Sequence, residues 1–376
     1  MRVAHVSDVY LPRTGGIESQ VRGLTQAQAA AGEHPVIFTA TPAGRRRAVI
    51  PGETDNGVPI HRLAVRLPAS LPVTPHVGSS LARALKAQAD VVHVHGGLVS
   101  PFAWPALRTA VHAGLPAVVT VHSVWANWAP LIGGLNSVTG WRRWPVIWTT
   151  VSETAAESLQ RALADSCTVA IMPDGIDIDT WRGQARPDKD PNELVVVSVA
   201  RLALRKRSLA LVEMLAAARK QLPADVKLRA VLIGDGPDRS KIERVISERK
   251  LDWIELAGWR SSSEIREIFA DSDVFINPTR LESFGIAALE ARTFGLPVVA
   301  LSGSGVTSFV HNGVEGLIAA DDAGMTRAIV RLATDRTLLA TLTDHNRTTI
   351  PPFGWPQVIE TASGLYHQAI DLTARR

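Results

Sequence analysis

Residues 2–18 of the chain read RVAHVSDVYLPRTGGIE, a stretch that predicts a strand, a glycine loop and a helix in that order. The apolar run Arg2–Ser7 is typical of a buried parallel strand, and Ile17–Ala31 has a helical pattern. Between them, Gly15 and Gly16 let backbone N–H groups approach an anion at a helix N-terminus, because no Cβ stands in the way. A phosphate site and a plain turn explain these two glycines equally well.

Short apolar runs alternate with helical patterns along the whole chain. Further strands are expected at His34–Thr39, Val58–Leu63, Val91–His95, Ala117–Val121, Ile147–Val151, Leu194–Ala200, Leu228–Ile233, Trp253–Leu256, Val274–Asn277 and Pro297–Ala300. Apolar strands that alternate with helices indicate parallel sheets covered on both faces. We therefore predict the α/β class, with two doubly wound domains that face a cleft. Ligands of such folds bind outside the carboxyl ends of the strands.

The domain boundaries follow from the length and from one break in this rhythm. A chain of 376 residues suits two domains. Residues 172–193 contain three prolines, two glycines and mixed charge, which is typical of a linker. We predict domains at residues 1–172 and 173–350, followed by a C-terminal segment, residues 351–376. Its amphipathic helix, Phe353–Thr373, is expected to cross back to the first domain.

The composition excludes several classes of protein. Apolar residues make up 46% and charged residues 20%, which is ordinary for a globular protein and argues against disorder. The one cysteine, Cys167, excludes a disulfide scaffold and suits a reducing compartment. The longest stretch without a charged residue, Thr109–Trp141, is interrupted by glycines and prolines, so no spanning helix is expected there. We expect a cytoplasmic protein.

Four cations follow the strand Leu194–Ala200, where a parallel strand presents its carboxyl end. They are Arg201, Arg205, Lys206 and Arg207. Positive charges crowded within seven residues favour an anion between them, and a diphosphate is the obvious candidate, since guanidinium and ammonium groups both bind phosphate oxygens. A solvated basic loop is the alternative.

Two carboxylates flank the start of a helix after the strand Val274–Asn277. Glu282 lies at the helix entry and Glu290 lies within the helix. Eight residues of helical rise span about 12 Å, more than the roughly 5–9.5 Å between the paired carboxyls of glycosidases. The spacing instead suits two carboxylates that hold opposite ends of one long ligand. A helix cap and an unrelated surface glutamate are the alternative.

Three other patterns carry less weight. The Asp-x-Asp triplets at residues 177–179, 188–190 and 271–273 lie in the linker or at a turn, so no metal site is expected from them. Gly303–Ser308 nearly matches a dinucleotide fingerprint, but serine stands at the third glycine. We take His93 and His95 to point to opposite faces of one strand, so that they form no metal pair. His122, at the carboxyl end of the next strand, is the better functional candidate.

The order and spacing of these motifs resemble the retaining glycosyltransferases of family 4, which have the GT-B fold of two Rossmann-like domains. The likeness rests on the glycine loop, on Arg201 with Lys206, and on Glu282 with Glu290, and it covers nearly the whole chain. Gly234–Pro237 and Ala257–Trp259 also resemble segments of that family. Within it, the actinobacterial phosphatidylinositol mannosyltransferase branch is loosely similar.

The resemblance implies a nucleoside diphosphate sugar donor, held mainly by the second domain, and an acceptor bound by the first. It places Arg201, Lys206, Glu282 and His122 among the catalytic residues, and Gly15, Gly16, Gly258, Phe284, Gly285 and Glu290 among those that bind the donor. It further implies a metal-independent transfer of a hexose, with no cofactor besides the co-substrate. In the usual proposal the departing phosphate oxygen takes the proton of the acceptor.

The acceptor is the least determined part of the prediction. Residues 1–150 contain 13 Lys and Arg against 6 Asp and Glu, so this half is expected to attract an anion. The cations Arg45–Arg47, Arg62 and Arg66, with the tryptophans of Trp141–Trp148, suit an anionic lipid surface. Surface loops and core tryptophans explain them equally well. We expect no nucleic acid partner, and either a lipid acceptor with peripheral attachment to the inner membrane face, a glycan or a small molecule.

Three other functions stay open on the sequence alone. They are a non-catalytic protein that binds nucleotide sugars, a GT-B-shaped epimerase or phosphorylase, and a nicotinamide-dependent dehydrogenase that uses Gly303–Ser308.

Overall fold

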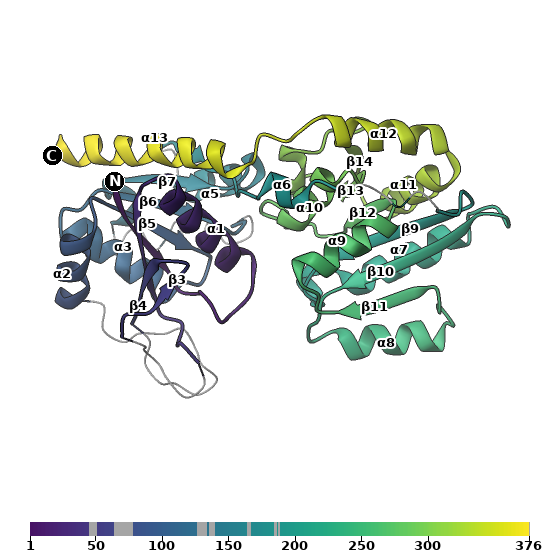
Figure 1. Cartoon of the computed structure of the whole chain (residues 1–376), viewed down its shortest axis with the longest axis horizontal. Coiled ribbons are helices and arrows are strands. Elements are labelled where there is room, and N and C mark those ends of the chain that lie inside the picture. The colour runs from purple at the N-terminus through teal and green to yellow at the C-terminus, as the bar shows by residue number, and fades with distance from the viewer. Residues whose placement is uncertain are drawn as a thin grey trace. The chain divides into compact units, whose positions relative to one another are not determined.

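The computed structural model describes residues 1–44, 51–63, 78–125, 134, 140–163, 167–183, 186 and 189–375. The chain forms two compact units (Figure 1). The first comprises Met1–Gly175 and Phe353–Arg376, and the second comprises Ile176–Pro352.

The first unit is built on one sheet, which within the described residues has eight strands in the order β3-β4-β2-β1-β5-β6-β7-β8. The strands are β1 (Arg2–Ser7), β2 (His34–Thr39), β3 (Thr54–Asp55), β4 (Val58–Arg62), β5 (Val91–Gly96), β6 (Ala117–Val121), β7 (Val146–Thr150) and β8 (Val169–Ile171). All neighbouring strands are parallel except β3 and β4. Strands β5 and β6 are buried along their whole length, as expected for a sheet covered on both faces.

Helices cover both faces of this sheet. They are α1 (Gly16–Ala30), α2 (Ser79–Gln88), α3 (Ala103–His112), α5 (Glu153–Leu163) and α13 (Trp355–Ala374), with a 3₁₀ turn η2 (Trp141–Arg143). Apolar side chains of α2, α3 and α5 pack on one face. Helices α1 and α13 share the other face, where Leu24 and Tyr366 belong to one buried cluster with Val3 and Val118 (Figure 1). The C-terminal helix is therefore part of the first unit.

The second unit repeats the design with six described strands in the order β11-β10-β9-β12-β13-β14, all parallel. The strands are β9 (Glu193–Val199), β10 (Lys227–Ile233), β11 (Ile254–Gly258), β12 (Val274–Asn277), β13 (Val298–Leu301) and β14 (Gly316–Ala319). The helices are α6 (Ile178–Trp181), α7 (Ser208–Arg219), α8 (Arg239–Glu248), α9 (Ser262–Asp271), α10 (Ile286–Phe294), α11 (Asp322–Thr334) and α12 (Arg336–Thr348), with 3₁₀ turns η3 (Leu204–Lys206) and η4 (Gly305–Ser308).

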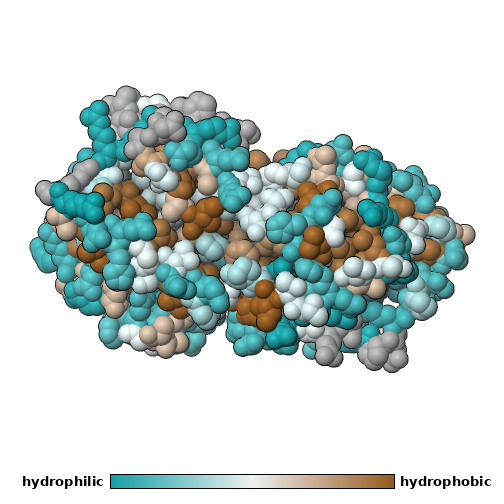
Figure 2. Space-filling model, turned by 90° about the horizontal axis from the view of Figure 1, so that it is seen from above, coloured by the Kyte–Doolittle hydropathy of each residue, from teal (hydrophilic) through white to brown (hydrophobic). Residues whose placement is uncertain are grey.

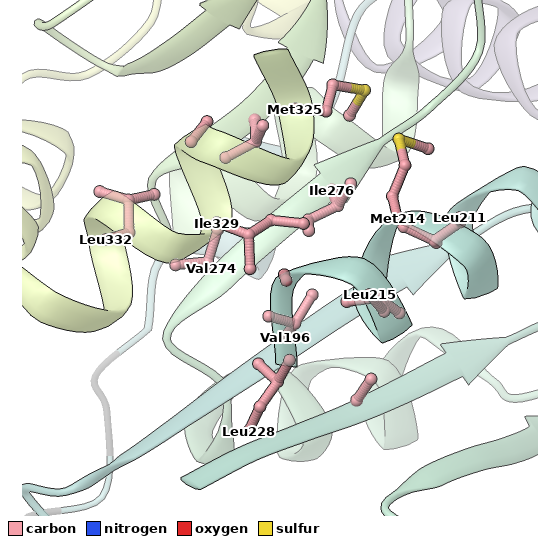
Figure 3. Packing of buried hydrophobic residues seen from close by; sticks show 14 of the residues in the cluster. Val196, Leu211, Met214, Leu215, Leu228, Val274, Ile276, Met325, Ile329 and Leu332 are labelled. Carbon is pink, nitrogen blue, oxygen red and sulfur yellow. The ribbon is translucent and has the colours of Figure 1, made fainter. Parts of the chain in front are cut away.

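The main core of the second unit lies between its sheet and helices α7 and α11. Figure 3 shows Leu211 and Leu215 of α7 and Ile329 of α11 gathered over the strand residues Val196 and Val274. These five side chains are at most 1% exposed. This packing fixes the sheet, and with it the loops that leave its carboxyl edge.

The predicted fold class is confirmed, since both units are α/β with parallel, doubly wound sheets. The predicted strands at Arg2–Ser7, His34–Thr39, Ala117–Val121 and Val274–Asn277 have the observed bounds, and the others differ by one or two residues at an end. The prediction missed β3, β8 and β14. These strands have two to four residues, too few to show a strand pattern in the sequence.

Candidate active site

One loop follows each of the six described strands at the carboxyl edge of the second sheet, and the predicted donor residues of this unit lie in or close to three of these loops. Arg201 and Lys206 follow β9, Gly258 ends β11, and Glu282 follows β12, just before α10. Parallel strands present their carboxyl ends at one edge, so the fold brings these residues to the same side of the sheet. Glu290 lies within α10, about one turn beyond its start at Ile286.

Lys206 and Glu282 form an ion pair. The Lys206 ammonium nitrogen lies 2.7 Å from a Glu282 carboxylate oxygen, and the side chains are 37% and 12% exposed. The contact joins the loop after β9 to the loop after β12 across neighbouring strands. From the sequence the two groups are expected at different parts of a ligand, and their contact with each other is not predicted. Together they present an ammonium donor and a carboxylate acceptor at one point of the edge.

The basic cluster divides into two parts. Arg207 donates to the carbonyl oxygen of Pro278 and to the carboxylate of Asp322, at 2.9 and 2.6 Å, so it holds two loops together. Arg201 and Arg205 are exposed, and the contacts between described residues include no ion pair for either. The interpretation that all four cations surround one anion is therefore wrong for Arg207. The exposed Arg201 and Arg205, and the partly exposed Lys206 with its partner Glu282, remain accessible to a ligand.

The loop Glu282–Gly285 is held in place by a neighbouring glycine. The backbone N–H of Gly305 donates to the carbonyl oxygen of Glu282 at 2.8 Å. Phe284 is 1% exposed and packs on Phe309 with ring centroids 5.2 Å apart. Gly285 has a φ of 97°, a conformation that glycine adopts without strain, and it begins α10. The Phe284 side chain is thus structural, and the backbone amides at this helix start carry partial positive charge.

Replacing Gly305 by alanine tests how tightly this loop is held. A Cβ at this position would lie 2.0 Å from the carbonyl oxygen of Ser283, so the loop before α10 would have to move. We expect a free energy of unfolding lower by about 1–3 kcal/mol, as for overpacking, together with weaker donor binding. Denaturant unfolding and nucleotide titration measure both. Gly364→Ala is the matched control, because nothing lies within 4 Å of a Cβ there. A loss at both positions would contradict this account.

Glu290 has no hydrogen bond or ion pair among the contacts between described residues. It lies on α10 between buried apolar neighbours, Leu289 and Ala291. Burial raises the pKa of its carboxyl to about 8, since the charged form loses hydration without gaining a partner. A half-buried carboxyl with unused hydrogen-bonding capacity, close to the edge where the other donor residues lie, is available to a ligand.

The glycine loop of the first unit lies at the start of α1. Gly15 and Gly16 are both exposed, and no side chain caps the helix. The carboxylate of Glu18 extends over this end, with one oxygen 2.6 Å from where a Cβ of Gly15 would stand. The helix N-terminus is therefore open to solvent but already faces one acidic group of the chain.

His122 follows β6, and both nitrogens of its buried ring face other side chains of the first unit. Its Nε2 lies 3.2 Å from Nδ1 of His95, and its Nδ1 lies 3.5 Å from an oxygen of Asp174. Asp174 lies in the linker segment, 52 positions further along the chain, and the sequence patterns give it no role beside His122. Its position soon after the end of a strand is the one sign of this contact in the sequence.

The expectation that His93 and His95 point to opposite faces is wrong. Residues two apart on a strand share a face, and the two ring centroids lie 4.1 Å apart. With His5 they form the one group in the described part of the chain whose ligand atoms, all within 4.8 Å of one another, could hold a metal ion. Their nitrogens, however, already lie 2.7–3.2 Å from the side chains of Gln28, Thr120, Tyr366, His122 and one another. A hydrogen-bonded cluster describes this group better than a metal site.

Two family models match the chain over most of its length. "Glycosyltransferase Family 4" matches residues 14–180, and "Glycosyl transferases group 1" matches residues 193–335. The chain belongs to the family 4 glycosyltransferases. The first match covers most of the first unit. The second begins at β9 and includes Arg201, Lys206, Glu282 and Glu290.

Curated relatives agree with this assignment, and solved structures agree with the fold. The chain is 26% identical over its full length to a protein of Arabidopsis thaliana that forms part of phosphatidylinositol N-acetylglucosaminyltransferase, covering 83% of that protein. It is 28% identical to a GDP-mannose-dependent alpha-mannosyltransferase of Mycolicibacterium smegmatis, covering 98% of both chains. The fold resembles HepE of Anabaena in complex with UDP, with a TM-score of 0.70, 16% identity and coverage of 97% and 99%.

The structure of residues 303–308 does not fit the alternative of a nicotinamide-dependent dehydrogenase. A dinucleotide fingerprint needs a glycine loop that opens a helix, whose N-terminus binds the pyrophosphate. Gly305–Ser308 instead forms the four-residue turn η4, and its first glycine supports the loop of Glu282.

The residues proposed to meet a lipid surface have structural roles in part. Arg62 is 6% exposed and pairs with Glu53 at 2.6 Å. Trp148 is 2% exposed and packs on Trp141. Arg45–Arg47 and Arg66 lie outside the described residues. No helix among the described residues has the length and apolar character needed to span a bilayer. The face in Figure 2 shows hydrophobic side chains in separate groups among hydrophilic ones.

Four of the aspartates in the acidic triplets contact protein groups. Asp177 caps α6, and Asp190 pairs with Lys227 at 3.0 Å. Asp271 pairs with Arg186, and Asp273 pairs with Lys189 at 3.0 Å. Asp188 lies outside the described residues.

Proposed function

We propose that this glycosyltransferase moves a hexose from a nucleoside diphosphate sugar to an acceptor hydroxyl, with retention of the anomeric configuration and without a metal ion. The observation that carries the proposal is the Lys206–Glu282 ion pair, 2.7 Å long, at the carboxyl edge of the second sheet. It joins the loop after β9 to the loop before α10. Helix α10 also bears the carboxyl of Glu290, which has no partner among the described residues.

The residues suit the charges that develop in such a reaction. As the bond between the anomeric carbon and the phosphate oxygen breaks, negative charge grows on the leaving diphosphate. Lys206 and Arg201 would neutralise that charge, and the amides of Phe284 and Gly285 would add partial positive charge. Groups placed in advance stabilise the transition state more than the ground state. Glu282 would accept hydrogen bonds from the sugar, and Glu290 from the ribose.

Retention is proposed from the likeness to the retaining transferases of family 4. If Glu282 and Glu290 hold opposite ends of the donor, neither is free to act as a nucleophile at the anomeric carbon. Retention then requires the acceptor oxygen to attack from the face that the diphosphate leaves, and its proton passes to the departing phosphate oxygen. The new glycosidic bond forms on the same face as the bond that breaks.

A donor screen tests this function. We expect slow hydrolysis of one of the UDP-, GDP- or ADP-sugars, unchanged by EDTA, and release of a sugar whose anomeric configuration by NMR is that of the donor. Calorimetric titration with UDP, GDP and NAD provides a second measurement. Tight binding of NAD with no binding of any nucleoside diphosphate would overturn the proposal. Binding of a donor without any turnover, with or without acceptors, would favour a non-catalytic protein.

We further propose that the acceptor is a lipid head group, reached at the inner membrane face. The excess of seven positive charges in residues 1–150 supports this, as do relatives named for phosphatidylinositol and for diacylglycerol glycosylation. Sedimentation with vesicles containing phosphatidylinositol should remove the protein from solution at low salt and less at high salt. Protein that stays in solution at low salt would favour a soluble glycan or small-molecule acceptor.

A further inference from the structure

A continuous row of polar side chains crosses the interior of the first unit and ends at His122. Gln28 Oε1 lies 2.7 Å from His5 Nε2, and His5 Nδ1 lies 3.0 Å from His95 Nε2. His95 Nδ1 lies 3.2 Å from His122 Nε2, and His122 Nδ1 lies 3.5 Å from Asp174. Gln28 and His5 are 0% exposed and His95 is 3% exposed, so water does not replace these contacts. We call Gln28, His5, His95 and His122 the histidine chain.

A second row of contacts fixes which way the amide of Gln28 points. The Thr149 hydroxyl donates to the carbonyl oxygen of Val119, which can only accept. Thr149 must then accept a hydrogen bond from the Thr120 hydroxyl, 2.7 Å away. Thr120 must in turn accept a hydrogen bond from Nε2 of His93, also 2.7 Å away. The thioether of Met172, 3.7 Å from the Thr120 hydroxyl, is a much weaker acceptor.

The same reasoning continues from His93 to Gln28. Because His93 uses Nε2 as a donor, its Nδ1 accepts from the Tyr366 hydroxyl at 2.9 Å. The oxygen of Tyr366 then accepts from the Gln28 amide nitrogen at 3.3 Å. The Gln28 amide therefore turns its nitrogen toward Tyr366 and its oxygen toward His5.

Because the Gln28 oxygen accepts a hydrogen bond from His5, it determines which nitrogen of each ring in the histidine chain carries hydrogen. His5 must donate through Nε2 to the oxygen of Gln28, which leaves its Nδ1 as an acceptor. His95 then donates through Nε2 to His5, and His122 donates through Nε2 to His95. Burial lowers the pKa of His5 to about 4 and those of His93 and His95 well below the ordinary value, so these rings are neutral and carry one hydrogen each.

At His122 this arrangement of hydrogens brings the ring next to the carboxylate of Asp174. With its one hydrogen committed to Nε2, the neutral ring would turn a bare nitrogen, Nδ1, toward the carboxylate of Asp174. A second proton on Nδ1 converts this repulsion into an ion pair. The titratable groups that face His122 among the described residues are His95 from β5 and Asp174 after β8, with His93 and His5 behind them.

We propose that the histidine chain confines proton uptake and release by His122 to Nδ1, facing Asp174, and that Gln28, His5 and His95 are positioning residues for it. The inference concerns the first unit alone. It rests on the proposed function only in one respect, which is that the charge on His122 matters to sugar transfer.

Nitrogen NMR of the protein labelled at its histidines tests the proposal, because the two nitrogens of a ring report which of them carries hydrogen. In the wild type we expect His5, His93, His95 and His122 all to carry hydrogen on Nε2, and His122 to gain its second proton on Nδ1. Gln28→Met removes the terminal acceptor at similar volume. It should abolish the single-tautomer signature at His5 and also at His122, three contacts away.

Matched variants complete the experiment. Gln88→Met breaks a similar pair, in which Gln88 lies 2.8 Å from His61, and should leave the signals of the histidine chain unchanged. Thr149→Val perturbs the row from its other end and gives the same expectation should Gln28→Met fail to fold. Hydrogen on Nδ1 alone in the neutral His122 ring of the wild type would overturn the proposal. A His122 nitrogen spectrum that neither Gln28→Met nor Thr149→Val changes would also overturn it. So would a shift of the His5, His93 and His95 signals on addition of one equivalent of zinc, because these residues would then bind a metal.

Activity then separates this inference from the proposed function. If His122 acts in transfer, Gln28→Met should lower kcat several-fold while the fold and nucleotide binding persist. An altered tautomer with unchanged kcat supports the histidine chain and removes His122 from the catalytic residues.

Discussion

Replacing Lys206 by alanine is expected to lower kcat by about 10²–10³-fold, the cost of removing one donor that stabilises developing negative charge. The ammonium of Lys206 lies in the loop after β9, 2.7 Å from Glu282. Its loss would leave the leaving diphosphate with less positive charge in the transition state and would free Glu282 from its partner. Steady-state kinetics with the donor found in the screen measures the effect. KM should change much less than kcat, because the charge grows only as the bond breaks.

Arg205→Ala is the matched control for Lys206→Ala. Both residues lie on the same turn, η3, and Arg205 is exposed. We expect its removal to change kcat by less than the loss of Lys206 does. The thermal midpoint should be close to wild type in both variants, since the Lys206 side chain is 37% exposed and such ion pairs add little to stability. Equal kcat values for wild type and Lys206→Ala would contradict the assigned role.

The edge at which the site lies could be predicted from the sequence because of the strands. Val274–Asn277 is apolar and short, and the polar loop that begins at Pro278 follows it directly. In a parallel sheet this pattern alone places Glu282 at the carboxyl edge, and the same reasoning places Arg201 after β9. Helical spacing then puts Glu290 about one turn into α10. These inferences need only local patterns.

The contacts that complete the site could not be predicted in that way. The Lys206–Glu282 pair joins residues 76 positions apart, and Gly305 supports the Glu282 loop from another strand end. A sequence contains no local sign of which side chains meet across a sheet. His93 and His95 show a different failure, because the period of two along β5 already places both on one face. The sequence pattern alone therefore predicts this contact, and the expectation of opposite faces is wrong.

Removing the carboxyl of Glu290 is expected to weaken donor binding far more than it lowers turnover. The group has no partner among the described residues, and burial raises its pKa to about 8. If it accepts hydrogen bonds from the ribose, Glu290→Ala should raise the dissociation constant for the nucleoside diphosphate about 10–100-fold, the cost of hydrogen bonds to a charged group. Calorimetric titration measures this. A dissociation constant within a factor of two of wild type would remove Glu290 from the donor site.

The raised pKa also predicts how binding depends on pH. Below pH 8 the carboxyl of Glu290 in the free protein is largely protonated. The ionised carboxylate is the form that best accepts hydrogen bonds from two ribose hydroxyls. Donor binding should then release a proton, and affinity should rise between pH 6 and pH 8. Titrations in buffers of different ionisation enthalpy detect that proton. Glu290→Gln should release none from this position, and its affinity should vary less over the same range.

The raised pKa of Glu290 should also make stability depend on pH, in the direction opposite to donor affinity. An acid whose pKa is raised from 4.5 to about 8 on folding favours the folded state below pH 4.5, and this contribution is lost as pH rises to 8. Glu290→Gln removes the loss, so it should raise the free energy of unfolding by about 3 kcal/mol at pH 7 and by almost nothing at pH 4. Denaturant unfolding at several pH values measures the difference. Glu248→Gln, at an exposed position of α8, should show no such trend. A substitution that strengthens the fold while weakening the donor complex identifies a carboxyl kept for a ligand at the expense of stability, which a merely structural glutamate would not do.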